Sequence, residues 1–159
     1  MKFVLLVLIC VLFESCFNDG NCIITATNSM HIQFKKESNS KLDTSVYFRH
    51  IYISGADAIY FKNDTLVSDI LIPIDIYSSA TTFIFQYANT DTFDTLLVGY
   101  SAQSKIIAKD CGAFTYYQNL EVLKTNLKDS RIKVFNTSLL KDPSIAGNSG
   151  YALNYQILY

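Results

Sequence analysis

The sequence contains no tryptophan, and proline, histidine and glutamate are scarce. Its 159 residues include two prolines, two histidines and three glutamates. Few glutamates beside many Ile, Tyr, Phe and Thr residues form a composition typical of strands rather than helices. The formal net charge is only −1. Because the chain has no excess of positive charge, it lacks the electrostatic attraction that nucleic acid or anionic lipid requires, and we expect no nucleic-acid partner.

The scarcity of histidine and glutamate also limits the chemistry that the chain can perform. His31 and His50 stand apart, so no histidine pair has a metal-ligand spacing, and no nucleophile-elbow motif occurs. His31 falls on the polar side of an alternating segment, which predicts a solvated side chain. Paired carboxylates would have to come from the eleven aspartates, most of which stand in turn sequences. We therefore predict no catalytic residue, no metal site and no cofactor.

Two segments permit weaker kinds of ligand binding. The sequence from Asn89 to Asp94 alternates oxygen-bearing side chains, but it lacks the glycine and the distant glutamate of an EF-hand loop. A hairpin turn is the favoured interpretation, with weak calcium binding as the alternative. Phe114, Tyr116 and Tyr117 form an aromatic cluster. Such clusters on strands usually belong to a core, and a sugar-stacking platform is the alternative.

The N-terminus has the pattern of an export signal. One lysine precedes an uninterrupted apolar run from Phe3 to Phe13, which is 11 residues long. That is too short for a bilayer core of about 30 Å, which takes about 20 residues to cross. An apolar run of this length between a positive charge and a polar stretch is typical of a signal peptide. We expect residues 1–15 to be removed on export; a buried strand or helix is the alternative.

The end of this apolar run resembles the bacterial lipobox. Phe13 stands at position −3, the small residue Ser15 at −1 and Cys16 at +1, while Glu14 departs from the usual −2 residue. In a lipobox the cysteine thiol takes a diacylglyceryl group, and several acyl chains on one residue hold a protein stably at a membrane. We therefore expect Cys16 to be the lipidated first residue of a mature outer-membrane lipoprotein. Residues 16–30 would form its tether.

The remaining cysteines then form an even pair. Of four cysteines, Cys10 leaves with the signal peptide and Cys16 carries lipid, so Cys22 and Cys111 are left. Export places them where disulfides form and persist. A bridge across 111 − 22 = 89 positions would contribute about 4–5 kcal/mol by restricting the unfolded chain. Two free thiols or a pair of metal ligands are the alternatives, although two cysteines without nearby histidines make a poor zinc site.

Short strand-like segments follow one another from residue 31 to the C-terminus. They lie at residues 31–35, 46–53, 70–76, 82–87, 95–100, 105–109, 113–118, 131–135 and 151–159. Turn sequences rich in Gly, Asn, Asp and Ser separate them. This pattern predicts an all-β fold, an antiparallel β-sandwich of about eight strands that is immunoglobulin-like in architecture. It would be a single domain over residues 31–159, and residues 119–127 are the one segment where a short helix competes.

Several short motifs are similar to those of one protein family. They are the lipobox Cys16, Asp19–Cys22, Ile32–Phe34, Ile70–Ile74, Thr82–Phe85, Asp94–Val98 and Cys111–Gly112. With these motifs the chain resembles a family of uncharacterised lipoproteins from Bacteroidota, a domain of unknown function. The resemblance implies a small β-rich domain outside the cytoplasm with paired cysteines, and it implies no activity. The chain departs from the pattern at Ala113, where relatives often carry an aromatic residue.

Two classes of function are consistent with these observations. The first is a non-catalytic binding or assembly module of the cell envelope, facing the periplasm or the cell surface. Its partner would be an envelope protein or a glycan, in addition to the membrane that holds its lipid. The second is an envelope hydrolase whose residues gather from separate strands. A cleft that holds His31 or His50 beside a carboxylate would favour the hydrolase.

Overall fold

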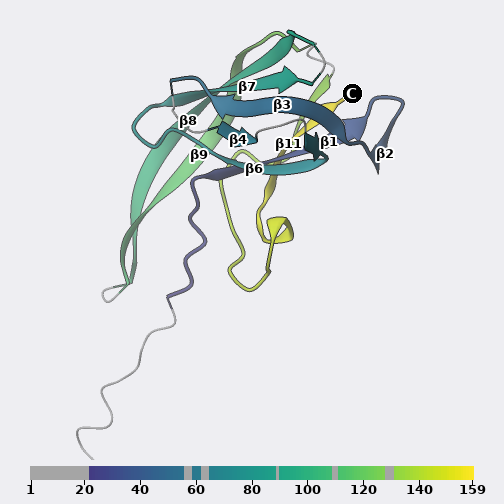
Figure 1. Ribbon diagram of the computed structural model, residues 1–159. Coiled ribbons are helices and arrows are strands. Elements are labelled where there is room, and N and C mark those ends of the chain that lie inside the picture. Colours follow the sequence, from purple (N-terminus) through teal and green to yellow (C-terminus); the bar gives the residue numbers. More distant parts are fainter. Residues whose placement is uncertain (1–21, 56–58, 62–64, 89, 109–110, 128–130) are drawn as a thin grey trace, which may run out of the picture.

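A computed structural model describes residues 22–55, 59–61, 65–88, 90–108, 111–127 and 131–159. The expected signal peptide, the expected lipidation site Cys16 and the turn residue Asn89 lie outside the described residues. The described part consists of eleven strands and one short 3-10 helix (Figure 1). None of its helices is long and apolar enough to cross a membrane. The elements are β1 (Ser29–Lys36), β2 (Asn39–Asp43), β3 (Val46–Ile53), β4 (Ile59–Phe61), β5 (Thr65–Val67), β6 (Asp69–Pro73), β7 (Ala80–Tyr87), β8 (Phe93–Ala108), β9 (Gly112–Thr125), β10 (Ile132–Val134), η3 (Asn148–Gly150) and β11 (Leu153–Leu158).

The strands form two sheets, which confirms the predicted all-β sandwich. One sheet has the order β10-β11-β1-β2, with β6 beside β1; the other has the order β4-β3-β7-β8-β9, with β5 beside β3. Every strand pair is antiparallel except β1 with β11, which run parallel. The strands outnumber the eight expected, chiefly because β2, β4 and β5 are too short or too exposed to show an apolar alternation.

The core lies between the two sheets and is rich in aromatic rings. Alternation along β1 buries Met30, Ile32 and Phe34 completely, since successive side chains of a strand point to opposite faces. The ring of Phe34 lies 5.2 Å from that of Phe48 on the facing sheet, and Phe48 lies 5.8 Å from Phe85. Both contacts are tilted; the first joins the two sheets, and the second links the neighbouring strands β3 and β7 of one sheet.

The strands β8 and β9 form one long hairpin where two separate strands and a possible helix were expected. Residues 95–108 belong to a single strand rather than to two, and residues 119–125 are strand rather than helix. The competing helix does not form in residues 119–125, because β9 continues there through a bulge. Asn119 adopts φ 57° where the register of the hairpin shifts. Asparagine tolerates this left-handed conformation, so the chain bends there without leaving the sheet.

The outer half of this hairpin projects from the body of the sandwich (Figure 1). Residues 93–99 of β8 pair with β7, and residues 96–99 pair with β9 as well, whereas residues 101–108 pair only with β9. Two features brace the projection against the first described residues. A disulfide joins Cys22 to Cys111 at the tip, and the Thr25 Oγ1 atom lies 3.4 Å from the Tyr116 hydroxyl.

Candidate functional site

His31 and Asp69 form the one histidine–carboxylate pair in the described part of the chain. Both lie on the outer face of their sheet, His31 on β1 and Asp69 on β6. The His31 Nε2 atom is 2.7 Å from Asp69 Oδ2. The residue is only 4% exposed, so the predicted solvated side chain is wrong. The segment that contains η3 packs over the outer face at this point, and the local alternation of β1 gives no sign of it.

Both ring nitrogens of His31 face hydrogen-bond acceptors. The Nδ1 atom lies 3.1 Å from the backbone carbonyl oxygen of Tyr151, and Nε2 faces the carboxylate of Asp69. A carbonyl or a carboxylate can only accept, so both contacts are satisfied when the ring carries both protons. A general base needs a free nitrogen lone pair directed at a substrate. The geometry therefore suits a structural hydrogen-bonded pair better than a catalytic dyad.

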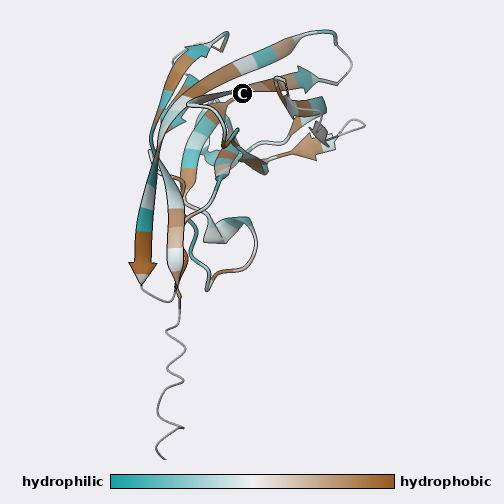
Figure 2. Cartoon of the chain, turned by 90° about the vertical axis from the view of Figure 1, so that its left-hand side faces the viewer, coloured by the Kyte–Doolittle hydropathy of each residue, from teal (hydrophilic) through white to brown (hydrophobic). Residues whose placement is uncertain are grey.

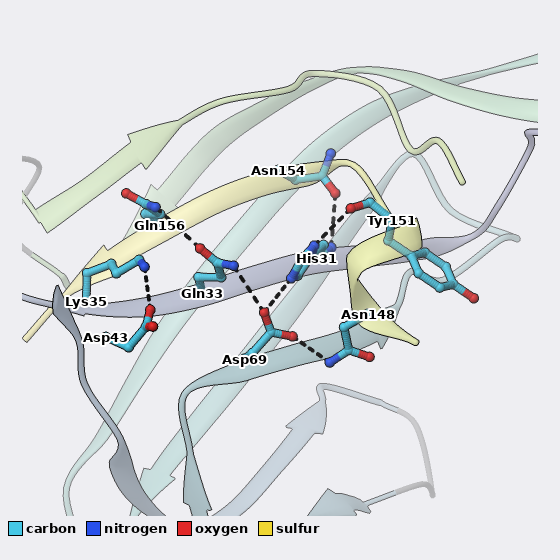
Figure 3. A network of polar contacts seen from close by, with 9 residues as sticks. All are labelled: His31, Gln33, Lys35, Asp43, Asp69, Asn148, Tyr151, Asn154 and Gln156. Atoms are coloured by element: carbon cyan, nitrogen blue, oxygen red, sulfur yellow. Dashed lines mark hydrogen bonds and ion pairs between the residues drawn. The ribbon is translucent and has the colours of Figure 1, made fainter. Parts of the chain in front are cut away.

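Asp69 is also the centre of a wider polar network (Figure 3). Its carboxylate accepts hydrogen bonds from His31, from the Gln33 amide at 3.2 Å and from the Asn148 amide. The Asn154 side chain accepts from the His31 backbone at 3.0 Å and donates to two carbonyl groups. Because Asn148 belongs to η3, this network fastens the loop before β11 to the outer face of the sheet.

The second histidine is not part of this arrangement. His50 lies on β3 of the other sheet, opposite Gln86 of β7. Its Nδ1 atom is buried, and no hydrogen-bond partner for that atom occurs in the described residues. The fold thus keeps the two histidines on different sheets. No group of three or more His, Cys, Asp or Glu side chains that could hold a metal ion occurs within the described ranges.

The described part of the 89–94 turn uses its carboxylates for contacts within the protein. The Asp94 carboxylate accepts hydrogen bonds from the Tyr87 and Tyr159 hydroxyls. Asp91 lies 3.7 Å from the Arg49 guanidinium. Burial, together with the hydrogen bonds to Asp94, raises the pKa of the Tyr87 and Tyr159 phenols above the ordinary value. These contacts favour the hairpin turn over a calcium loop.

Two of the three aromatic residues of the β9 cluster pack inside the protein, and the third, Phe114, is half-buried. Tyr117 belongs to the core, with its ring 5.9 Å from that of Tyr100. Tyr116 points to the other face, where the Lys105 ammonium lies 5.2 Å from the centre of its ring. Both tyrosines are buried. The structure thus favours the packing interpretation for the cluster.

An open groove lies beside the first described residues. Its volume is about 550 Å³, which lies within the range typical of small-molecule sites. We call it the N-terminal groove; its lining includes Ile23, Thr25, Leu140, Lys141, Pro143 and Tyr151. A second hollow of about 440 Å³ shares Lys141 and Tyr151 with it.

Three short extended segments build the N-terminal groove. The Lys141 amide donates to the Thr25 carbonyl at 2.9 Å, and the Ala152 amide donates to the Leu140 carbonyl at 2.9 Å. These bonds lay residues 25–26, 140–142 and 150–152 side by side. The loop between the last two segments requires a glycine at position 150. A Cβ atom there would lie only 2.4 Å from the Ile145 carbonyl oxygen.

The N-terminal groove is mainly apolar, and its lining carries one cation, Lys141, and one carboxylate, Asp142. Leu140 and Ile23 are exposed hydrophobic side chains in its wall. The Lys141 ammonium lies 5.2 Å from the centre of the Tyr151 ring, a cation–π contact at the junction of the two hollows. Such a surface suits an extended apolar segment of a partner, or a sugar that stacks on the tyrosine. Sequence reasoning missed this site because its walls come from both ends of the chain.

One comparison with known proteins gave a match. The model of a family of unknown function (DUF6452) matches residues 45–148. None of the curated proteins and none of the solved structures compared with the chain matches it.

Proposed function

The chain belongs to the DUF6452 family, whose function is unknown, and we propose that it is a non-catalytic binding module of the cell envelope. It would be a lipoprotein of the kind found in Bacteroidota, held at the outer membrane by lipid on Cys16. The N-terminal groove would receive an apolar segment of an envelope protein or a glycan. The observation that carries the proposal is the groove itself, which combines exposed aliphatic side chains with the Lys141–Tyr151 pair.

Two features of the chain support the envelope location. The Cys22–Cys111 disulfide is the kind of bond that persists in oxidising compartments outside the cytoplasm. The lipobox-like segment that ends at Cys16 stands six positions before Cys22 (22 − 16 = 6). A lipid on Cys16 would therefore hold the folded domain close to a membrane surface.

An envelope hydrolase is the alternative, and the observation in its favour is the His31–Asp69 pair. The binding module has more support because both nitrogens of His31 already face acceptors. In addition, His31 is not among the residues that line the N-terminal groove. A hydrolase would require the loop that carries Asn148 to lift away from the sheet.

Site-specific photo-crosslinking in intact cells tests the proposal. A photoreactive amino acid replaces Leu140 in the groove, or Leu66 on β5 as a control of comparable size that is also exposed. We expect a discrete adduct from position 140 that weakens when Lys141→Glu is added, and no such adduct from position 66. Equal labelling from the two positions would contradict the groove as the binding surface.

Fractionation tests the anchor separately. The Cys16→Ser variant should leave the membrane fraction, because without the thiol no diacylglyceryl group can be attached. Globomycin should likewise make the unprocessed precursor accumulate. A Cys16→Ser protein that stays in the membrane fraction with unchanged mobility would contradict lipidation at this residue.

A further inference from the structure

The tip of the β8–β9 hairpin exposes aliphatic side chains where the first described residues meet it. Ile106, near the end of β8, is 78% exposed, and Ile23, next to the disulfide residue Cys22, is 63% exposed. The disulfide to Cys111 holds these two parts of the chain together at the tip. Figure 2 shows the hydrophobic end of β8 at the lower end of the molecule, outside the body of the sandwich.

The number of residues between Cys16 and Cys22 limits how far the hairpin tip can lie from a lipid attached to Cys16. From Cys16 to Cys22 the chain advances six residues (22 − 16 = 6), and a fully extended chain of that length spans about 20 Å. An acyl chain on Cys16 lies in the hydrocarbon region of its membrane. The disulfide would therefore keep the hairpin tip within about 20 Å of the lipid, whatever the orientation of the rest of the domain.

We propose that the hairpin tip, through Ile23 and Ile106, inserts into the interfacial region of the lipid bilayer as a second membrane contact. The inference rests on the proposed lipid at Cys16. The contact rests on two exposed aliphatic side chains of described residues, Ile23 and Ile106. The chain has no excess of positive charge to attract anionic headgroups. Burying two exposed isoleucines in the headgroup–acyl boundary removes their apolar surface from water.

The two-stranded form of the tip fits this role. Residues 101–106 of β8 are exposed, and beyond residue 100 the strand pairs only with β9. A ribbon of two strands is marginally stable by itself, and the Cys22–Cys111 bond joins its end to the first described residues. Because Ile23 also lines the N-terminal groove, the groove would open beside the membrane surface.

The absence of tryptophan makes a direct test possible. The Ile106→Trp and Phe93→Trp variants each have a single tryptophan in the mature lipidated protein, which is reconstituted in phosphatidylcholine vesicles. Phe93 is a matched control because it lies at the other end of β8 and is also exposed. The two positions are 106 − 93 = 13 residues apart, a distance of about 40 Å along a strand.

We expect brominated phosphatidylcholine to quench the Ile106→Trp fluorescence and to leave the Phe93→Trp fluorescence unchanged. The emission of Ile106→Trp should also shift to shorter wavelength when vesicles are present. If both variants float with the vesicles but the brominated lipid quenches neither tryptophan, the second contact is overturned and the lipid anchor is not. Protein that does not float with the vesicles would instead contradict the lipid on Cys16, so the two failures are distinguishable.

The alternative to a lipid contact is self-association, in which the open strand edge of the tip pairs with a second copy of the chain. Self-association through the tip would shift the Ile106→Trp emission without vesicles and in proportion to protein concentration. That result would overturn the lipid contact. An Ile106→Trp emission that is independent of concentration and moves only when vesicles are added supports it.

Discussion

The Cα atoms of Cys22 and Cys111 lie 5.7 Å apart and their side chains form a disulfide, although 89 positions separate them in the chain. The bond connects the start of the described domain to the tip of its longest hairpin. It closes a large loop, and loops of this size lose the most conformational entropy in the unfolded chain when they are closed. The same bond sets the distance between the proposed anchor and the hairpin.

Removing this disulfide should lower the stability of the domain by about 4–5 kcal/mol in the chain-entropy model. The Cys22→Ser, Cys111→Ser double variant avoids leaving a single thiol. Urea denaturation measures the loss of stability, and amide hydrogen exchange should show the largest increase in residues 101–117. A double variant with unchanged stability and unchanged exchange in the hairpin would contradict the bracing role of the bond.

The contact between His31 and Asp69 should contribute more to the free energy of unfolding than the contact between Lys35 and Asp43 in the same sheet. Asp69→Asn removes a charge that faces a buried ring, and we expect a loss of about 1–3 kcal/mol. Asp43→Asn is the matched control: the side chain of Asp43, which pairs with Lys35, is 73% exposed, against 28% for Asp69. Exposed pairs contribute about 0–1 kcal/mol.

Urea denaturation at neutral pH measures both variants. Equal losses would contradict the structural role of the Asp69 network. Unchanged stability of Asp69→Asn, together with the loss of a hydrolytic activity present in the parent protein, would instead favour the enzyme alternative.

Alternation along the sequence predicted which faces of the strands are buried. It placed Ile32 and Phe34 opposite His31, and both are in the core. It could not predict that His31 is buried on the outer face, because Tyr151, whose backbone carbonyl contacts the His31 ring, lies 120 positions later in the chain. The pairing of β1 with β11, the first strand with the last, is invisible to local patterns for the same reason. The disulfide was predictable because the expected removal of Cys10 and the expected acylation of Cys16 leave only one possible pair.

The N-terminal groove could not be predicted either. Its walls combine Ile23 and Thr25 with residues of the 140–152 segment, and only hydrogen bonds between distant segments bring them together. The extent of the β8–β9 hairpin was missed because residues 101–105 are mostly small or polar, which suggests a break. In this part of β8 the side chains on both faces are exposed, so the usual alternation of apolar and polar residues disappears.

Replacing Tyr155 by phenylalanine should leave the protein at least as stable as the parent. The residue is fully buried, and within the described structure its hydroxyl has no hydrogen-bond partner. An unpaired buried hydroxyl costs about 1–3 kcal/mol. Tyr159→Phe is the control and should destabilise, since its hydroxyl donates to Asp94. Thermal unfolding distinguishes the two; a Tyr155→Phe variant that unfolds well below the parent would contradict the assignment.

Stability should fall as the pH rises above about 10. Burial raises the pKa of the Tyr155 phenol to about 12 and raises the pKa of Tyr87 and Tyr159 as well. The folded state therefore keeps protons that the unfolded chain begins to release near pH 10, so alkaline pH favours unfolding. Each phenol contributes at most about 1.4 kcal/mol per pH unit.

Urea titrations between pH 8 and pH 11.5 measure this effect, and absorbance at 295 nm reports ionisation of the phenols. The absorbance change of the buried phenols should coincide with unfolding. Stability that stays constant across this range, or phenols that ionise fully while the domain remains folded, would contradict the burial of the three hydroxyl groups.

Mass spectrometry of the N-terminal peptide from membrane-extracted protein tests the central claim most directly. An envelope lipoprotein requires that the mature chain begin at Cys16 and that this residue carry a diacylglyceryl group on its thiol. The expected peptide starts at Cys16 and has the added mass of glycerol and fatty acyl chains. A mature N-terminus at any other residue, or a Cys16 peptide with an unmodified thiol, would contradict the proposed anchor and the membrane contact that depends on it.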